Sequence, residues 1–337
     1  METYEPTKDE IEKWRELNPR DSFSMMDSQV AERIREERGL PPESAEQGNG
    51  SGVGNANMDE DIEGFEIPSR SKRGSLWTKS EDNPHRIVEP DLNFLLSKVD
   101  LTPPEEAVKM LTEMFPGLNT ENWEQALKKG IAPAVRACRS LEIDEERLIV
   151  FPWIKRASLA RISGNKRGTH YGALVEKVVF PKLKELYKQR GLGFVNYRAG
   201  TMSTDSYLRM EDRTADWLNN AETAVKDSDI CFSAVILDLF HGYSVNATRY
   251  ETEKEKRLIN STCCVLQQML LTHIQLQTKW EELYWWMPGD KYDRNGQSRF
   301  PSSLCCDVYI SNFRFAYDYI ANAGTHYGSA VFPSELL

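Results

Sequence analysis

The sequence feature that most constrains the fold is the apolar periodicity of residues 248–286, TRYETEKEKRLINSTCCVLQQMLLTHIQLQTKWEELYWW. Apolar side chains recur at helical spacing from Leu258 to Trp280, which is typical of an amphipathic helix. Thr248 and Glu251 have the spacing of a capping box, and Pro288 marks the end of the pattern. The spacing therefore predicts one long helix from about 249 to 286.

Shorter segments with the same periodicity occur elsewhere in the chain. They cover 103–115, 120–130, 169–191, 205–226 and 307–324. The run RLIVFPW, which begins at Arg147, predicts a buried strand or an extended segment, and nothing in the chain alternates strands with helices as a parallel sheet requires. We therefore expect a mainly α fold, a single large helical domain with few short strands over 77–337.

Residues 1–76 differ from the rest, with ten Lys and Arg against eighteen Asp and Glu. The stretch 43–61, ESAEQGNGSGVGNANMDED, is rich in Gly, Asn and acidic residues and has little to bury. Two helical patterns, 7–17 and 27–39, are too short to be stable alone. These residues predict a flexible acidic N-terminal arm and linker, or a segment that folds on a partner.

Composition excludes several classes of protein. No apolar run is long enough to cross a bilayer, and Met1 is not followed by a signal peptide pattern, so we expect a protein made in the cytosol without membrane contact. The six cysteines have no C-x-x-C spacing, and we expect buried thiols rather than disulfides or a zinc site.

The pentapeptide Gly-Thr-His-Tyr-Gly occurs twice, at 168–172 and 324–328. The first copy precedes a predicted helix that Thr169 can cap, and the second follows one. The flanking residues share little beyond a later VFP. We interpret both copies as helix-boundary turns rather than a duplicated site.

Known catalytic patterns are missing from the sequence. There is no G-x-S-x-G, Walker loop or H-E-x-x-H motif, and the five histidines do not cluster. A metal-dependent nuclease needs an acidic residue two places before a lysine on a strand, and no Asp or Glu here has that neighbour. We therefore expect no enzyme, no metal and no cofactor.

Positive charge is concentrated in residues 147–200, where twelve Lys and Arg face two acids, Glu176 and Glu185, although the whole chain has a net charge of −10. Basic groups on one surface bind phosphates, and interleaved aromatic side chains can stack on bases. The predicted RNA- and phosphate-binding residues are Lys155, Arg156, Arg161, Lys166, Arg167, Lys182, Lys184 and Arg190. The alternative is a solvated face paired with acidic neighbours.

Aromatic residues are concentrated towards the C-terminus, in KWEELYWWMPGDKYD and SNFRFAYDY. A single helix cannot bury all of them within its own domain, and surplus aromatic surface is typical of oligomer interfaces. The predicted assembly interface consists of Trp280, Trp285, Trp286 and Tyr292. Core packing is the alternative interpretation.

The predicted long helix at 248–286, the aromatic C-terminal helix and the flexible arm resemble the coat proteins of plant cryptic double-stranded RNA viruses, the partitiviruses, over about 77–337. The resemblance implies a homo-oligomeric, dimer-based shell around genomic RNA, with a viral polymerase as a further partner. It also implies a location in the virion and the host cytoplasm, and no catalytic step in the coat.

Two other functions remain open from the sequence. A nucleoprotein of a negative-strand RNA virus would hold single-stranded RNA in a basic cleft lined by 147–200. A metal-dependent nuclease would use acidic residues within 205–238. The form of the purified assembly separates the first from a coat protein, and cleavage of nucleic acid in Mg²⁺ would identify the second.

Overall fold

The computed structural model describes residues 62–72, 82–89, 99–164, 170–273, 284–309 and 312–334, together with Thr7 and Leu276. The chain divides into two compact units, Met1–Ala56 and Asn57–Leu337, and the elements described below belong to the second. The boundary lies inside the segment predicted as a flexible arm over 1–76. Ile62 and Phe65 lie within the predicted arm, and their apolar side chains pack against the core of the second unit.

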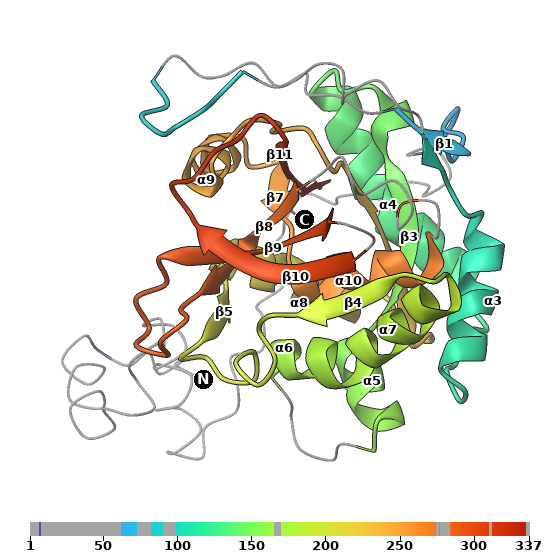
Figure 1. The fold of residues 1–337 in the computed structure, drawn as a ribbon. Coiled ribbons are helices and arrows are strands. Elements are labelled where there is room, and N and C mark those ends of the chain that lie inside the picture. Colours follow the sequence, from blue (N-terminus) through green and yellow to red (C-terminus); the bar gives the residue numbers. More distant parts are fainter. Residues whose placement is uncertain are drawn as a thin grey trace. The chain divides into compact units, whose positions relative to one another are not determined.

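The prediction of a mainly helical domain is wrong, because the C-terminal segments predicted as helices form a β-sheet. Its strand order is β11-β8-β9-β10-β4, and β5 also pairs with β8. The strands are β4 (Gly193–Asn196), β5 (Leu208–Met210), β8 (Tyr284–Tyr292), β9 (Ser302–Tyr309), β10 (Asn312–Tyr319) and β11 (Tyr327–Ser329). Strands β8, β9 and β10 are antiparallel, whereas β4 and β11 run parallel to their neighbours. Figure 1 shows β10 curving across the sheet.

Three two-stranded sheets complete the strands of the described part of the chain. They pair β1 (Arg70–Ser71) with β2 (Val99–Asp100), β3 (Ile149–Ile154) with β6 (Ile230–Val235), and β7 (Leu258–Asn260) with β12 (Val331–Pro333). Every residue of β3 and β6 is buried. The prediction of a buried strand in RLIVFPW is therefore confirmed.

The helices lie on both sides of these strands. They are α3 (Pro104–Met114), α4 (Trp123–Ser140), α5 (Arg156–Ile162), α6 (Tyr171–Leu174), α7 (Phe180–Gln189), α8 (Asp212–Ala224), α9 (Val245–Lys254) and α10 (Cys263–Thr272). A π-helical turn, Val175–Val179, joins α6 to α7, and a 3-10 turn, Glu145–Arg147, precedes β3. Among the described residues, no helix has the length and apolar character that crossing a membrane requires.

The prediction of one long helix over 249–286 is wrong, because this segment forms α9, β7 and α10 and its last three residues begin β8. Residues 274–275 and 277–283 lie outside the described part of the chain. Strand β7 interrupts the predicted helix because it pairs with β12. All ten residues of α10 are buried, so this segment is a helix enclosed on every side rather than an amphipathic one. The start also differs from the predicted capping box, since the Ser244 hydroxyl accepts a hydrogen bond from the Ala247 N–H at 3.1 Å and α9 begins before Thr248.

The aromatic run that follows is a strand with two different faces. Trp285 and Met287 lie in the main core, whereas Trp286 lies in a second cluster with Cys305 and Val245. Successive side chains of a strand point to opposite faces, which explains how adjacent bulky residues are all buried. Burial also alternates along β10. The prediction of a helix over 307–324 is therefore wrong, because most of this segment is strand.

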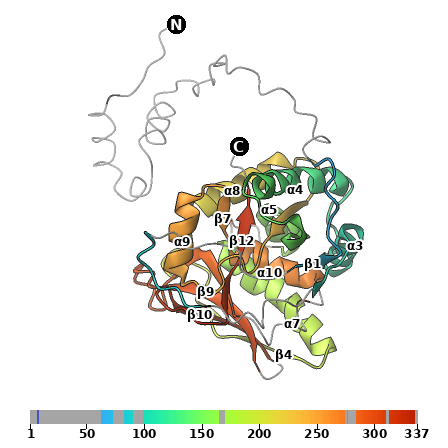
Figure 2. The same cartoon turned by 90° about the horizontal axis from the view of Figure 1, so that it is seen from above.

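Helix α7 covers one face of this sheet. The centres of the Phe180 and Phe315 rings are 4.8 Å apart, and those of the Tyr187 and Phe313 rings are 5.2 Å apart. Figure 2 shows α7 beside β4. The apolar side of α7 is therefore held on β10, and its opposite side faces solvent.

The two Gly-Thr-His-Tyr-Gly copies have different local structures. In the first, Thr169 lies outside the described residues, and the His170 ring caps α6 by accepting a hydrogen bond from the Gly172 N–H at 3.2 Å. In the second, a turn closed by the Tyr327 N–H and the Gly324 carbonyl leads into β11. The described residues of the first copy therefore begin a helix, and the second copy is a turn between the strands β10 and β11 rather than the end of a helix.

We predict that Gly130→Ala destabilises the protein. Helix α4 continues through this residue instead of ending there, and a Cβ atom on Gly130 would lie 2.1 Å from the carbonyl oxygen of Phe232 in β6. Overpacking outweighs the gain of about 1 kcal/mol in helix propensity, so we expect a net loss of about 2 kcal/mol in urea unfolding.

The matched control is Gly164→Ala. This residue has φ +69°, and no atom lies within 4 Å of the position that a Cβ atom would occupy, so only backbone strain of about 1 kcal/mol applies. Equal stability of Gly130→Ala and wild type would contradict the close packing of α4 on β6.

Candidate functional site

The basic residues predicted around α5 have partners within the fold. Arg156 forms a salt bridge to Glu222 of α8 at 2.7 Å, and Arg161 forms one to Asp229. The Lys155 ammonium donates to the Val225 carbonyl. Burial raises the pKa of Asp229, but hydrogen bonds from the Asn119 N–H, Ser158 and Arg161 outweigh it and the net pKa is lowered. Arg156 and Arg161 are therefore paired with acidic residues, as the alternative interpretation expects, and Lys155 is bound to a backbone carbonyl.

The predicted residues on α7 have a different environment. Lys184 and Arg190 are exposed, as are Lys177 and Lys188, and none of the four forms an ion pair within the described ranges. Lys182 is half-buried, with its ammonium 5.9 Å from the centre of the Phe115 ring. We call Lys177, Lys184, Lys188 and Arg190 the α7 basic face.

The predicted single basic surface is thus divided into two parts. The start of α5 is tied to α8 by the Arg156–Glu222 salt bridge, whereas Figure 2 shows α7 beside β4. Lys166 and Arg167, which would lie between the two parts in sequence, fall outside the described residues. The spacing in sequence did not reveal this division, because the carboxylates that pair with Arg156 and Arg161 come from Glu222 and Asp229, far along the chain.

The predicted assembly interface is not supported by the fold. Trp285, Trp286 and Tyr292 are completely buried within the chain, and Trp280 lies outside the described residues. Side chains without exposed area cannot contact a neighbouring subunit, so the core interpretation is correct for these three. The exposed large aromatic residues of the described part are Tyr197 and Tyr319.

A polar cleft of 430 Å³ lies between the start of α8 and the length of α9, with residues of β7 and β8 at its base. Three acids and three bases line it: Glu211, Asp212, Glu253, Arg213, Arg249 and Lys291. Asn246, His85 and Tyr250 also border it. Its volume lies in the range typical of small-molecule sites.

One wall of this cleft is a rigid network centred on Arg249. The Arg249 Nε lies 2.9 Å from the Glu211 carboxylate and donates to the Pro288 carbonyl at 2.8 Å, while Nη2 donates to the Asp290 carbonyl at 3.1 Å. Asn260 donates to the other Glu211 oxygen at 2.8 Å. Burial lowers the pKa of Arg249, and Glu211 opposes this effect. Sequence reasoning missed the network because its members come from distant segments and share no local motif.

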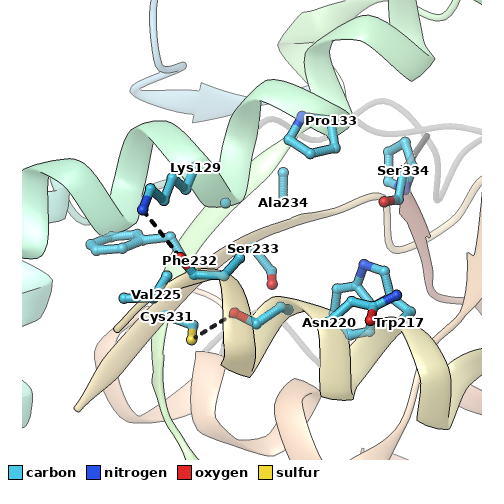
Figure 3. A pocket seen from close by; sticks show the side chains of 14 residues that line it. Lys129, Pro133, Trp217, Asn220, Val225, Cys231, Phe232, Ser233, Ala234 and Ser334 are labelled. Atoms are coloured by element: carbon cyan, nitrogen blue, oxygen red, sulfur yellow. Dashed lines mark hydrogen bonds between the residues drawn. The ribbon is translucent and has the colours of Figure 1, made fainter. Parts of the chain in front are cut away.

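A second, apolar pocket lies between α4, α8 and β6 (Figure 3). Its volume is only 80 Å³, and Trp217, Phe232 and Pro133 contribute to its walls. The polar atoms at its edge are satisfied, since Lys129 donates to the Ala224 carbonyl at 3.1 Å and the Cys231 thiol to the Ala221 carbonyl at 3.4 Å. We interpret this pocket as an imperfection of core packing rather than a ligand site.

The carboxyl group of Asp290 is a buried hydrogen-bond centre below the cleft. It accepts from the Cys263 N–H at 2.6 Å, from Thr262 at 2.8 Å and from the Tyr171 hydroxyl at 3.1 Å. Burial raises the pKa of Asp290 to about 6, although these hydrogen bonds oppose the shift. Burial also raises the pKa of the Cys264 thiol well above its usual range, so this thiol is not an activated nucleophile.

No group of three or more His, Cys, Asp or Glu side chains has metal-binding geometry in the described part of the chain. Neither a protein family model, nor a curated protein, nor a solved structure matches this chain. The site assignments below therefore rest on the geometry and charge of the chain itself.

We predict that Asp290 makes stability fall as the pH rises from about 4 to 6. Its folded-state pKa of about 6 exceeds the usual 3.8, so the unfolded state loses the proton at a lower pH than the folded state does. The free energy of unfolding is therefore lower above pH 6 than below pH 4, by up to about 3 kcal/mol. Urea unfolding of wild type and Asp290→Asn at pH 4.5 and pH 7 measures this contribution.

The stability of wild type relative to Asp290→Asn should be lower at pH 7 than at pH 4.5. A difference between the two proteins that stays constant with pH would show that Asp290 has the same pKa in both states.

Proposed function

We propose that this protein is a structural RNA-binding protein that contacts RNA phosphates through the α7 basic face, as a viral coat protein contacts its genome. The observation that carries the proposal is a set of four exposed cations without carboxylate partners among the described residues, in a chain whose net charge is −10. Neighbouring cations on a helix face repel one another by roughly 0.2–0.5 kcal/mol per pair, and a bound polyanion would remove this repulsion and release its own counterions.

The spacing of these cations supports contact with a polymer. Lys184 and Lys188 are one turn apart on α7, about 6 Å along the axis, and Lys177 lies about two turns earlier. Glu185 is the exposed acidic residue of this helix. It directly follows Lys184 in sequence, so its side chain leaves the helix in a different direction from that of Lys184. A row of cations of this length suits a run of phosphates better than a single small anion.

We predict that Lys184→Glu with Lys188→Glu weakens RNA binding at least about tenfold in fluorescence anisotropy. Loss of two phosphate contacts should also reduce the slope of log affinity against log salt by about 1.5. The matched control is Lys254→Glu with Lys256→Glu on and just after α9, which changes the net charge equally but replaces lysines paired with Asp82 and Glu253.

Two outcomes would contradict the proposed surface. Equal losses in both double variants would indicate a general charge effect, and unchanged binding with an unchanged salt slope would locate the phosphate surface elsewhere. Both variants alter exposed side chains, and circular dichroism of each should match the wild type.

The type of assembly is tested separately by electron microscopy of the purified protein with RNA. Closed particles support the coat-protein form of the proposal, whereas rings or filaments that contain RNA favour a nucleoprotein. Cleavage of the RNA in Mg²⁺ by wild type, lost on substitution of an acidic residue, would overturn a structural role.

A further inference from the structure

The polar cleft between α8 and α9 has a charge pattern that the RNA-binding proposal does not use. Two of its three cations are paired inside the cleft, Arg249 with Glu211 at 2.9 Å and Arg213 with Glu253 at 3.6 Å. The remaining two charges, Lys291 and Asp212, have opposite signs and form no ion pair with any described residue. Within the described ranges, the cleft therefore presents one free cation and one free anion on a wall that is otherwise neutral.

We propose that this cleft binds a small dipolar ligand of the α-amino acid type, whose carboxylate is held by Lys291 and whose ammonium is held by Asp212. A simple anion would bind Lys291 but face the Asp212 carboxylate, and a simple cation would face the reverse repulsion. A ligand with both charges satisfies both groups, and the volume of 430 Å³ accommodates one such molecule with a side chain.

The walls of the cleft suit this role because they are already ordered. Arg249 and Glu211 are only 17% and 18% exposed, and the backbone of β8 and the side chain of Asn260 hold them. Groups fixed before binding lose little conformational entropy when the ligand arrives. The side chains of Asn246 and His85, which border the same space, add polar contacts for the rest of the ligand.

The experiment is isothermal titration of the full chain with individual L-amino acids at millimolar concentration, each compared with its N-acetyl and carboxamide derivatives. At least one free amino acid should bind, and loss of either charge should abolish binding. Lys291→Met and Asp212→Asn should each weaken binding roughly tenfold or more, since each removes a charged contact.

The control variant is Lys72→Met, which removes a lysine that pairs with Asp144 and lies outside the cleft lining, and it should bind as wild type does. Lys291 and Asp212 have no ion pair to lose among the described residues, so the thermal midpoints of their variants should remain near that of wild type. The proposal is overturned if no amino acid binds, if the blocked derivatives bind equally well, or if both cleft variants bind as tightly as wild type.

Discussion

The fold depends on the complete burial of α10, and the Asp290 carboxyl group is what makes the N-terminus of that helix compatible with burial. The first N–H groups of a helix have no partner within it, and here Asp290 accepts from the Cys263 N–H and from Thr262. The carbonyl of the same residue accepts from Arg249 and Ser303. One residue of β8 thereby connects α10 with α9 and β9, and the cleft is built on the outer side of this connection.

Packing of α7 on the sheet determines which of its charges reach solvent. Burial of an aromatic or leucine side chain contributes about 1.5–3 kcal/mol, whereas an exposed ion pair contributes about 1 kcal/mol or less. Phe180, Leu183 and Tyr187 therefore orient the helix, and Lys184 and Lys188 face solvent as a consequence. The orientation of the α7 basic face is thus fixed by the core rather than by its own electrostatics.

Local sequence patterns predicted some elements and misassigned others for identifiable reasons. The strand β3 and the helix α3, with Pro104 at its start, were predictable because their signals are local. The YWWM run of β8 and the FRF run of β10 alternate with a period of two, but their aromatic residues also fit a helical stripe, and only pairing with β9 decides between them. Long-range pairing of this kind is not encoded in a short window.

The candidate sites were predictable to different degrees. The charge excess of residues 147–200 drew attention to α7, but it did not distinguish Lys184, which is exposed, from Arg156, which is bound to Glu222. The cleft had no sequence signal. The most direct test of the central claim is lysine acetylation footprinting with and without RNA: the account predicts protection of Lys184 and Lys188 but not of Lys254, and equal acetylation of all three in both samples would contradict it.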